Sequence, residues 1–416
     1  MQNSSKKVST RQIGNFALLF SSTIAIASNI LSPSIADAFI ALSIIIALFL
    51  SSSKDALHIP KTSTFKTINV LVAMWLIANL LGYVLIPGLG GEQIEEYLGL
   101  RWILALYGMI LVGFNKEITH SKLQLGILVA AVVTGLSIVR QYSIPHIPGV
   151  RFEGILGNAN VFAMSALMLW AFAFGLISPK HHPLTKKLLF YITPLLILTV
   201  ATYGTMTRSA WVGCLLCIFA LPFFFKRKKV FYALGVMLLI FAAMWHFNTF
   251  DFQSRILYSL KFSTGNSQAM RLVIWKTNWE IFKDHPIFGV GFYGNYRMIP
   301  EYYHRLGFDG MLVHPHAHNQ YLQIMVGSGI IGFISYLGIF AIAFNYFRKK
   351  VIQLKGQTDQ AIALGAFLVI VAYLGASFTE APLMLHSARN YLLMFLGISF
   401  GYLERRRLEQ TTSSQP

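Results

Sequence analysis

Three histidines occupy alternate positions in the segment HPHAHNQ, namely His314, His316 and His318. Imidazole exchanges protons near neutral pH, and His318 directly precedes an apolar segment, where it would meet both water and membrane. Alternating histidines could also bind a metal ion, but no nearby cysteine or acid completes a ligand set, and Pro315 interrupts regular structure. We therefore expect proton exchange at His318 and no metal site, with His316 and Asn319 as possible substrate contacts.

Arginines form the second group of residues that could do chemistry. Arg208 and Arg271 stand at the starts of predicted helices, where a cation opposes the helix dipole and calls for a compensating anion. The planar guanidinium can donate two parallel hydrogen bonds to a phosphate. Arg151 and Arg389 could extend this basic surface, although an ion pair between Arg389 and Glu380 is equally consistent with the sequence.

Apolar helices must position these side chains. Of the 416 residues, 55% are hydrophobic and only 12% are charged, which excludes a soluble globular fold. About twelve segments are apolar enough to span a membrane as helices. They lie near 14–32, 36–51, 68–87, 99–114, 123–139, 159–178, 186–204, 209–225, 230–247, 319–347, 360–379 and 384–402. The net charge of +18 comes without any nucleic-acid-binding motif, so no nucleic acid partner is expected.

Basic residues are concentrated in every second connection between these segments. Such alternation indicates that these connections are cytoplasmic, and it predicts twelve spans with both termini inside. Residues 1–247 would then hold nine spans, residues 248–317 a large loop on the outer side, and residues 318–416 three spans and a cytoplasmic tail. The fold class is therefore an all-α integral membrane protein.

The connection at 248–317 is too long to be a simple link and is expected to be functional. Within it, Trp275, Trp279 and Phe282 recur at helical spacing and predict an amphipathic helix. This helix could lie on the membrane surface, or its aromatic side chains could pack over the helix bundle.

Two further motifs do not indicate a function. The segment GVGFYG at 289–294 matches G-x-G-x-x-G, but no βαβ unit surrounds it, so we expect no dinucleotide. Cys214 and Cys217 lie inside the eighth predicted span, where thiols behave as small buried hydrophobic groups. No cofactor is expected.

Three local motifs, taken together, resemble those of one protein family. They are H-N-x9-G-x-x-G at 318–332, TRSAW at 207–211, and RLVIW at 271–275 followed by PIFGVG at 286–291. With these motifs, its many spans and one large outer loop, the chain is similar to the bacterial O-antigen ligases and O-antigen polymerases.

The resemblance implies a glycosyltransferase in the bacterial inner membrane, with its active site on the periplasmic face. No D-x-D or similar carboxylate pair appears among the outer acids, so we expect the reaction to need no metal ion. A glycan carried on undecaprenyl pyrophosphate would be transferred to a sugar hydroxyl of lipid A-core oligosaccharide. Arg208 and Arg271 would bind the pyrophosphate, and His318 would act on the acceptor hydroxyl as a general base or as a hydrogen-bond partner. The spacing after His318 favours a ligase. The alternatives are a polymerase that joins lipid-linked repeat units and, from another class, a transporter or flippase for an anionic substrate.

Overall fold

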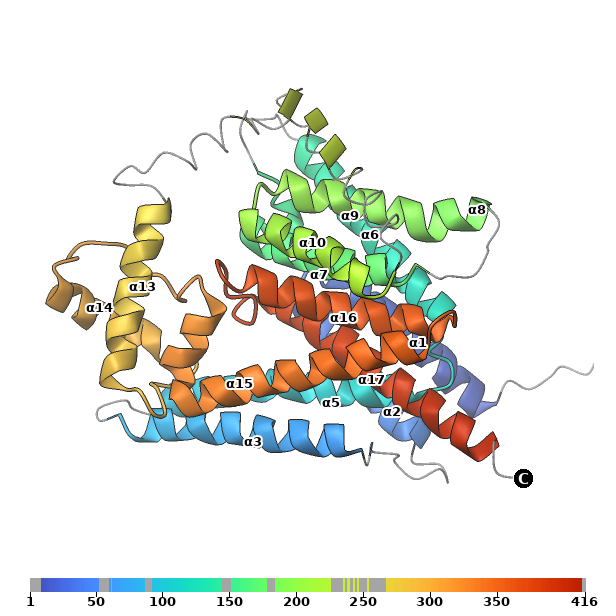
Figure 1. Ribbon diagram of the computed structural model, residues 1–416, viewed down its shortest axis with the longest axis horizontal. Helices are drawn as coiled ribbons and strands as arrows, with labels where there is room; N and C mark the ends of the chain where they lie inside the picture. The colour runs from blue at the N-terminus through green and yellow to red at the C-terminus, as the bar shows by residue number, and fades with distance from the viewer. Residues whose placement is uncertain are drawn as a thin grey trace, which may run out of the picture.

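The computed structural model describes residues 9–51, 60, 62–86, 92–143, 151–177, 184–225, 235, 238–239, 242–243, 245–246, 253 and 267–413. Within these residues every regular element is a helix (Figure 1), as the apolar composition predicts. The α-helices of the N-terminal half are α1 (Thr10–Ser28), α2 (Pro33–Ser51), α3 (Ser63–Val84), α4 (Glu92–Leu98), α5 (Ile103–Phe114), α6 (His120–Ser143), α7 (Ala159–Gly175), α8 (Leu184–Lys187), α9 (Thr193–Gly204) and α10 (Arg208–Ala220). Those of the C-terminal half are α13 (Ser267–Asp284), α14 (Asn295–Leu306), α15 (Gln320–Gln353), α16 (Asp359–Ala376) and α17 (His386–Ser413). Four short helical segments of other types join them, namely η1 (Gly99–Trp102), η2 (Gly154–Leu156), η3 (Leu188–Ile192) and η4 (Leu221–Phe223).

Seven helices in the described part of the chain are long and apolar enough to cross a membrane. They span Pro33–Ser51, Ser63–Val84, Glu95–Phe114, His120–Gln141, Thr185–Gly204, Gln320–Gln353 and Asp359–Ala376. Two shorter apolar helices cover Ala159–Gly175 and Arg208–Phe223. The protein is therefore a multi-pass α-helical membrane protein. The twelve-span topology and the division at 247 and 317 stay predictions, and most of the predicted ninth span, 230–247, lies outside the described residues.

Glycine contacts allow the central helices to approach closely. A Cβ atom on Gly175 of α7 would lie 2.2 Å from the Cα of Gly365 on α16. A Cβ on Gly113 of α5 would lie 2.3 Å from the carbonyl oxygen of Ile398 on α17. Small residues at such crossings let van der Waals packing hold membrane helices together. The buried helices α7, α16 and the first part of α17 form the core of the bundle.

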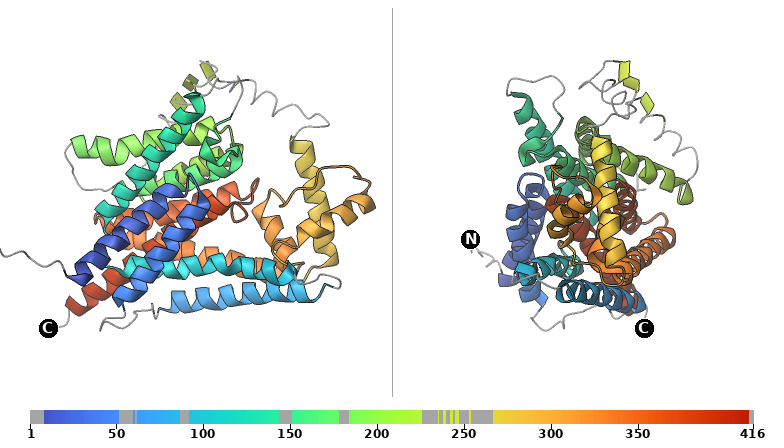
Figure 2. Two further views of the ribbon diagram at one scale, coloured as in Figure 1. Left: turned by 180° about the vertical axis from the view of Figure 1, so that it is seen from behind. Right: turned by 90° about the vertical axis from the view of Figure 1, so that its left-hand side faces the viewer.

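Helices α13 and α14 form a small unit at one end of the bundle. Figure 1 shows α13 crossing the general direction of α3, α5 and α15 at this end, and Figure 2 shows the same arrangement from behind. Ile281 and Ile299 pack in a small apolar cluster between α13 and α14. Arg305 of α14 forms an ion pair of 2.8 Å with Asp284 at the end of α13. The helix predicted around Trp275, Trp279 and Phe282 is observed as α13, whereas α14 was not predicted.

Candidate active site

A break in α15 sets the position of the loop that carries α13. Gly329, the first glycine of the G-x-x-G pair, has φ +60° and ψ −167°, values that interrupt the helix. The Val290 N–H donates to the Val326 carbonyl at 2.9 Å, and the Ile330 N–H donates to the Pro286 carbonyl at 2.8 Å. A Cβ on Gly289 would lie 2.3 Å from the Val326 oxygen, so this glycine is required for close packing. The segment GVGFYG therefore packs against α15 through Gly289 and against Tyr83 of α3 through Gly291, so these two glycines serve close packing.

Trp275 places α13 beside the segment that contains His318. Its indole N–H donates to the carbonyl oxygen of Ala317 at 3.0 Å. The Ala317 N–H in turn donates to Oε1 of the buried Gln323 at 2.9 Å. Because Arg271 precedes Trp275 by four residues, both side chains lie on one face of α13. The RLVIW motif therefore positions Arg271 next to His318.

The first residue of α15 holds the connection between α16 and α17. The Gln320 backbone N–H donates to the carbonyl oxygens of Ser377 at 2.9 Å and of Glu380 at 3.0 Å. Oε1 of Gln320 accepts a hydrogen bond of 2.9 Å from the Leu383 N–H. Glu380, whose side chain is fully buried, is thereby held beside the start of α15.

Glu380 is the centre of the polar cluster. His318 Nδ1 lies 3.0 Å from Glu380 Oε1, His316 Nδ1 lies 3.9 Å from the same oxygen, and Arg271 Nη2 lies 3.9 Å from Oε2. Burial alone would raise the pKa of Glu380, but the hydrogen bond from His318 and the electrostatic effects of His318, His316 and Arg271 outweigh it and lower the pKa. The carboxylate is therefore ionised at neutral pH.

An ionised carboxylate can only accept hydrogen bonds, so Nδ1 of His318 must carry the proton that it shares with Glu380. In the neutral imidazole, Nε2 is then left with its lone pair free to accept a proton. The side chain of His318 is 17% exposed, which leaves it open to a substrate. This arrangement suits a general base.

His318 and His316 are fixed relative to each other by the backbone between them. His318 has a positive φ of +48°, a strained conformation for a residue with a side chain. Its backbone N–H donates to Nδ1 of His316 at 3.2 Å. Burial, together with the neighbouring His318, lowers the pKa of His316 to about 4, so His316 is neutral at physiological pH. His316 therefore acts as a buried hydrogen-bond acceptor that helps to orient His318.

Arg208 starts α10 and is exposed. The turn before it is held by Arg151, whose Nε donates to the Thr205 carbonyl at 2.7 Å and whose Nη2 donates to Thr207 Oγ1 at 2.6 Å. Arg208 lies within electrostatic reach of Arg271, and the two cations repel each other. The two arginines that the sequence selects are thus near enough to interact electrostatically, while Arg151 supports the turn that presents Arg208.

Two predicted candidates have other contacts. The side chain of Asn319 caps α15 by accepting a hydrogen bond of 3.0 Å from the Leu322 N–H. Arg389 donates to the Leu383 carbonyl at 3.2 Å and stacks over Trp102 at 5.2 Å. Within the described residues Arg389 has no ion pair with Glu380, which instead contacts His318, His316 and Arg271. Arg389 is therefore not part of this cluster.

Three side chains of the cluster could converge on a metal ion, because ligand atoms of His316, His318 and Glu380 lie within 4.8 Å of one another. Glu380 Oε1 already accepts the hydrogen bond from His318, however. The guanidinium of Arg271 lies 3.9 Å from Oε2 and would repel a second cation. The geometry therefore suits an ion-pair network better than a metal site.

From the sequence, Glu380 is expected only as an ion-pair partner for Arg389. An isolated glutamate in a short connection between two apolar helices is a signal that could have selected it, since such a charge needs a buried partner. What the sequence could not supply is the fold that brings residue 380 to residue 318.

Comparison with known proteins adds one match. Residues 193–337 match the family model described as O-antigen ligase. The matched segment contains Arg208, Arg271 and His318 and ends before Glu380. No curated protein matches the chain. Members of the matched family are glycosyltransferase-like enzymes. The match over residues 193–337 supports the resemblance to the O-antigen ligases and polymerases.

Proposed function

We propose that the protein is an O-antigen ligase of the bacterial inner membrane, with both termini cytoplasmic and its active site on the periplasmic side. It transfers a glycan from undecaprenyl pyrophosphate to a sugar hydroxyl of lipid A-core oligosaccharide. The observation that supports this most strongly is the pairing of His318 with the buried Glu380, next to the exposed Arg208 and the partly buried Arg271. A base and an anion site side by side are what such a transfer requires.

His318 removes the proton of the acceptor hydroxyl. As the acceptor oxygen forms its bond to the anomeric carbon of the donor sugar, Nε2 takes the hydroxyl proton and the imidazole becomes a cation. Glu380, 3.0 Å from Nδ1, stabilises this cation and keeps the ring in its productive orientation. The carboxylate itself does not need to change its protonation state.

Arg208 and Arg271 act on the leaving group. The bond between the anomeric carbon and the diphosphate oxygen breaks, and its electron pair leaves with the undecaprenyl diphosphate. Guanidinium groups neutralise this developing charge and can bind the phosphates in a bidentate manner. The contact of Arg271 with Glu380 is long, at 3.9 Å, so Arg271 can turn toward a diphosphate without breaking a close ion pair. The reaction then needs neither a metal ion nor a cofactor.

Deletion of the gene in its host, followed by gel analysis of lipopolysaccharide, tests this proposal. A ligase predicts loss of all capped lipopolysaccharide and accumulation of the lipid-linked polymer. Retention of caps with a single repeat would indicate a polymerase instead. In proteoliposomes with radiolabelled lipid-linked glycan, an enzyme changes the attachment of the glycan, whereas a transporter or flippase would only move it across the bilayer.

A further inference from the structure

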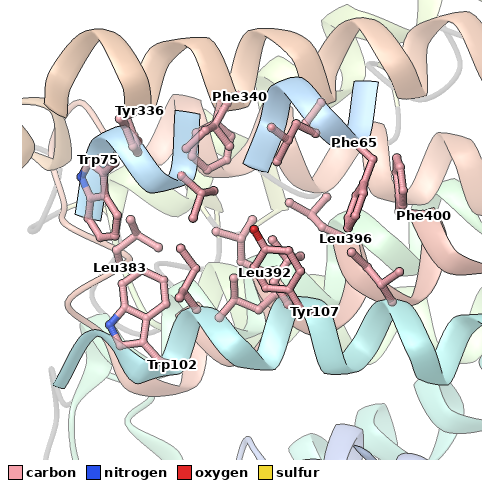
Figure 3. Close-up of a pocket in the computed structure, with 18 of the residues that line it drawn as sticks. Phe65, Trp75, Trp102, Tyr107, Tyr336, Phe340, Leu383, Leu392, Leu396 and Phe400 are labelled. Carbon is pink, nitrogen blue, oxygen red and sulfur yellow. The ribbon is translucent and has the colours of Figure 1, made fainter. Parts of the chain in front are cut away.

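A groove lies between the first turns of three helices, apart from the His318 cluster. It encloses about 480 Å³ and is lined by α2, by α5 with the turn before it, and by the start of α17. Trp102 lines both this groove and a separate cavity of about 110 Å³ between α3, α5, α15 and α17 (Figure 3). The cavity in Figure 3 is lined by aromatic and aliphatic side chains, whereas the groove has a charged end.

The charged end carries two arginines, Arg101 and Arg389. Neither forms an ion pair with a carboxylate within 4 Å in the described part of the chain. Arg101 is exposed, while Arg389 is 9% exposed and its Nε has no hydrogen-bond partner. Asp37, the acid at this end, lies 2.8 Å from His386 and also accepts a hydrogen bond from Asn390. Arg389 also donates to the Leu383 carbonyl and to the Tyr293 hydroxyl, and it lies within electrostatic reach of Asp37. Without a close carboxylate partner, both guanidinium groups can still attract an anionic ligand.

Most of the remaining lining of the groove is apolar. Ile40 and Ile44 follow Asp37 along α2 at helical spacing, and Leu104 and Leu111 follow Arg101 along α5. The side chain of Leu104 is 64% exposed on the outside of the bundle. The lining of the groove is thus charged near the first residues of the helices and apolar further along them. This order matches a lipid with its headgroup at the membrane surface and an acyl chain in the hydrocarbon layer.

We propose that this groove binds an anionic phospholipid from the leaflet in which α2, α5 and α17 begin. The headgroup phosphate lies between Arg101 and Arg389, and one acyl chain follows the apolar wall formed by Ile40, Ile44 and Leu104. Basic pockets between membrane helices bind acidic headgroups because the guanidinium fork matches the phosphate oxygens. This site is separate from Glu380 and His318 and does not depend on the proposed glycosyl transfer.

Native mass spectrometry of the full-length protein tests the proposal. The protein is mixed with equal amounts of phosphatidylglycerol and phosphatidylcholine that carry identical acyl chains. We expect phosphatidylglycerol adducts to dominate, and Arg101→Gln to reduce this preference about fivefold, the effect of one basic residue near an acidic headgroup. Arg389→Gln should act in the same direction. Arg389 is buried, so its variant is compared only if it keeps the wild-type unfolding temperature. Arg101 is exposed, so its replacement should not disturb the fold.

A steric variant tests the acyl chain separately from the charge. Ala41 lines the groove, and its neighbour Leu42 does not, so Ala41→Trp should reduce binding of both lipids while the matched control Leu42→Trp should not. Equal binding of the two lipids by the wild-type protein would overturn the proposal. So would a phosphatidylglycerol preference that is unchanged in Arg101→Gln together with lipid binding that is unchanged in Ala41→Trp. Displacement of phosphatidylglycerol by inorganic pyrophosphate would assign the arginines to a soluble phosphate ligand and would also contradict a lipid site.

Discussion

Nδ1 of His318 lies 3.0 Å from a carboxylate oxygen of Glu380, although the two residues are 62 positions apart in the chain. The contact joins the start of α15 to the connection between α16 and α17, and the carboxylate is fully buried. This pairing determines which nitrogen of His318 faces the substrate, and Glu380 is thus a positioning residue in the proposed reaction.

Replacing Glu380 by glutamine tests this role. Glu380→Gln keeps the size of the side chain but removes its charge and allows the amide to donate to His318, which would favour the unproductive tautomer. We expect turnover to fall about 10²-fold or more, within the range attributed to general-base catalysis, with donor affinity nearly unchanged. Steady-state kinetics with purified enzyme and lipid-linked donor provide both values.

A matched control for that variant is Glu404→Gln. Glu404 is also buried in α17 but binds Tyr346 and Arg407, away from the cluster. It should retain wild-type turnover in whatever fraction of the protein folds. Equal losses of turnover in the two variants would assign Glu380 a purely structural role.

Lysine at Arg208 or Arg271 keeps the positive charge but loses the planar fork. We expect Arg208→Lys and Arg271→Lys each to weaken donor binding and to lower activity steeply, because a lysine cannot bind a phosphate in a bidentate manner. Binding of radiolabelled lipid-linked glycan to the purified variants gives the affinity. Arg305→Lys, at the α14 residue that pairs with Asp284, is the control and should leave binding intact. Normal binding by both active-site variants would remove the arginines from the donor site.

His316 makes stability depend on pH in a defined window. Its pKa is lowered to about 4 in the folded protein from the ordinary value of 6.5. Between these values the unfolded chain binds a proton that the folded protein does not. Protonation of His316 therefore has no effect on the free energy of unfolding above pH 6.5 and lowers it increasingly as the pH falls toward 4. The lowered pKa of Glu380 acts in the same direction only near and below its ordinary value of 4.5.

Thermal unfolding of the detergent-solubilised protein between pH 6.5 and 4.5 measures this effect. His316→Asn retains an acceptor for the His318 N–H but cannot be protonated in this range. The variant should lose part of the decrease in unfolding temperature that the wild-type protein shows on acidification. Identical pH dependence in the two proteins would mean that His316 does not titrate as the geometry indicates.

The topology predicts that α13, α14 and the segment before His318 face the periplasm. Cysteine at Leu312 or Tyr296, which are 68% and 49% exposed, should react with an impermeant thiol reagent in cells whose outer membrane alone is permeabilised. The background carries Cys214→Ala and Cys217→Ala. Cysteine at Gln357, in the predicted cytoplasmic connection between α15 and α16, should react only after lysis of the inner membrane. The reverse pattern would invert the orientation.

Periodicity and composition predict much of the helical framework, because apolar runs of spanning length leave few alternatives to a membrane helix. They also predict α13, whose aromatic residues recur at helical spacing. They miss α14. This helix contains Pro300, which local sequence would read as a helix breaker, and it packs against α13. Local sequence carries no information about those tertiary contacts.

Motif spacing selects Arg208, Arg271 and His318, which the structure gathers at one end of the bundle. It does not select Glu380, because a contact between α15 and the α16–α17 connection depends on how helices distant in sequence pack. It also cannot tell that Asn319 is used as a helix cap or that Arg151 holds the turn before α10. Side-chain contacts of this kind become visible only in three dimensions.

The variant His318→Ala tests whether His318 acts on the acceptor while the arginines bind the donor. Donor affinity and turnover are measured on the same membrane-inserted protein, with His314→Ala as the control, since His314 lies beside His318 without contacting Glu380. We expect donor binding close to wild type and turnover reduced about 10²- to 10⁴-fold, the usual range for loss of a general base. Loss of donor binding in His318→Ala, or wild-type turnover, would contradict this division of roles.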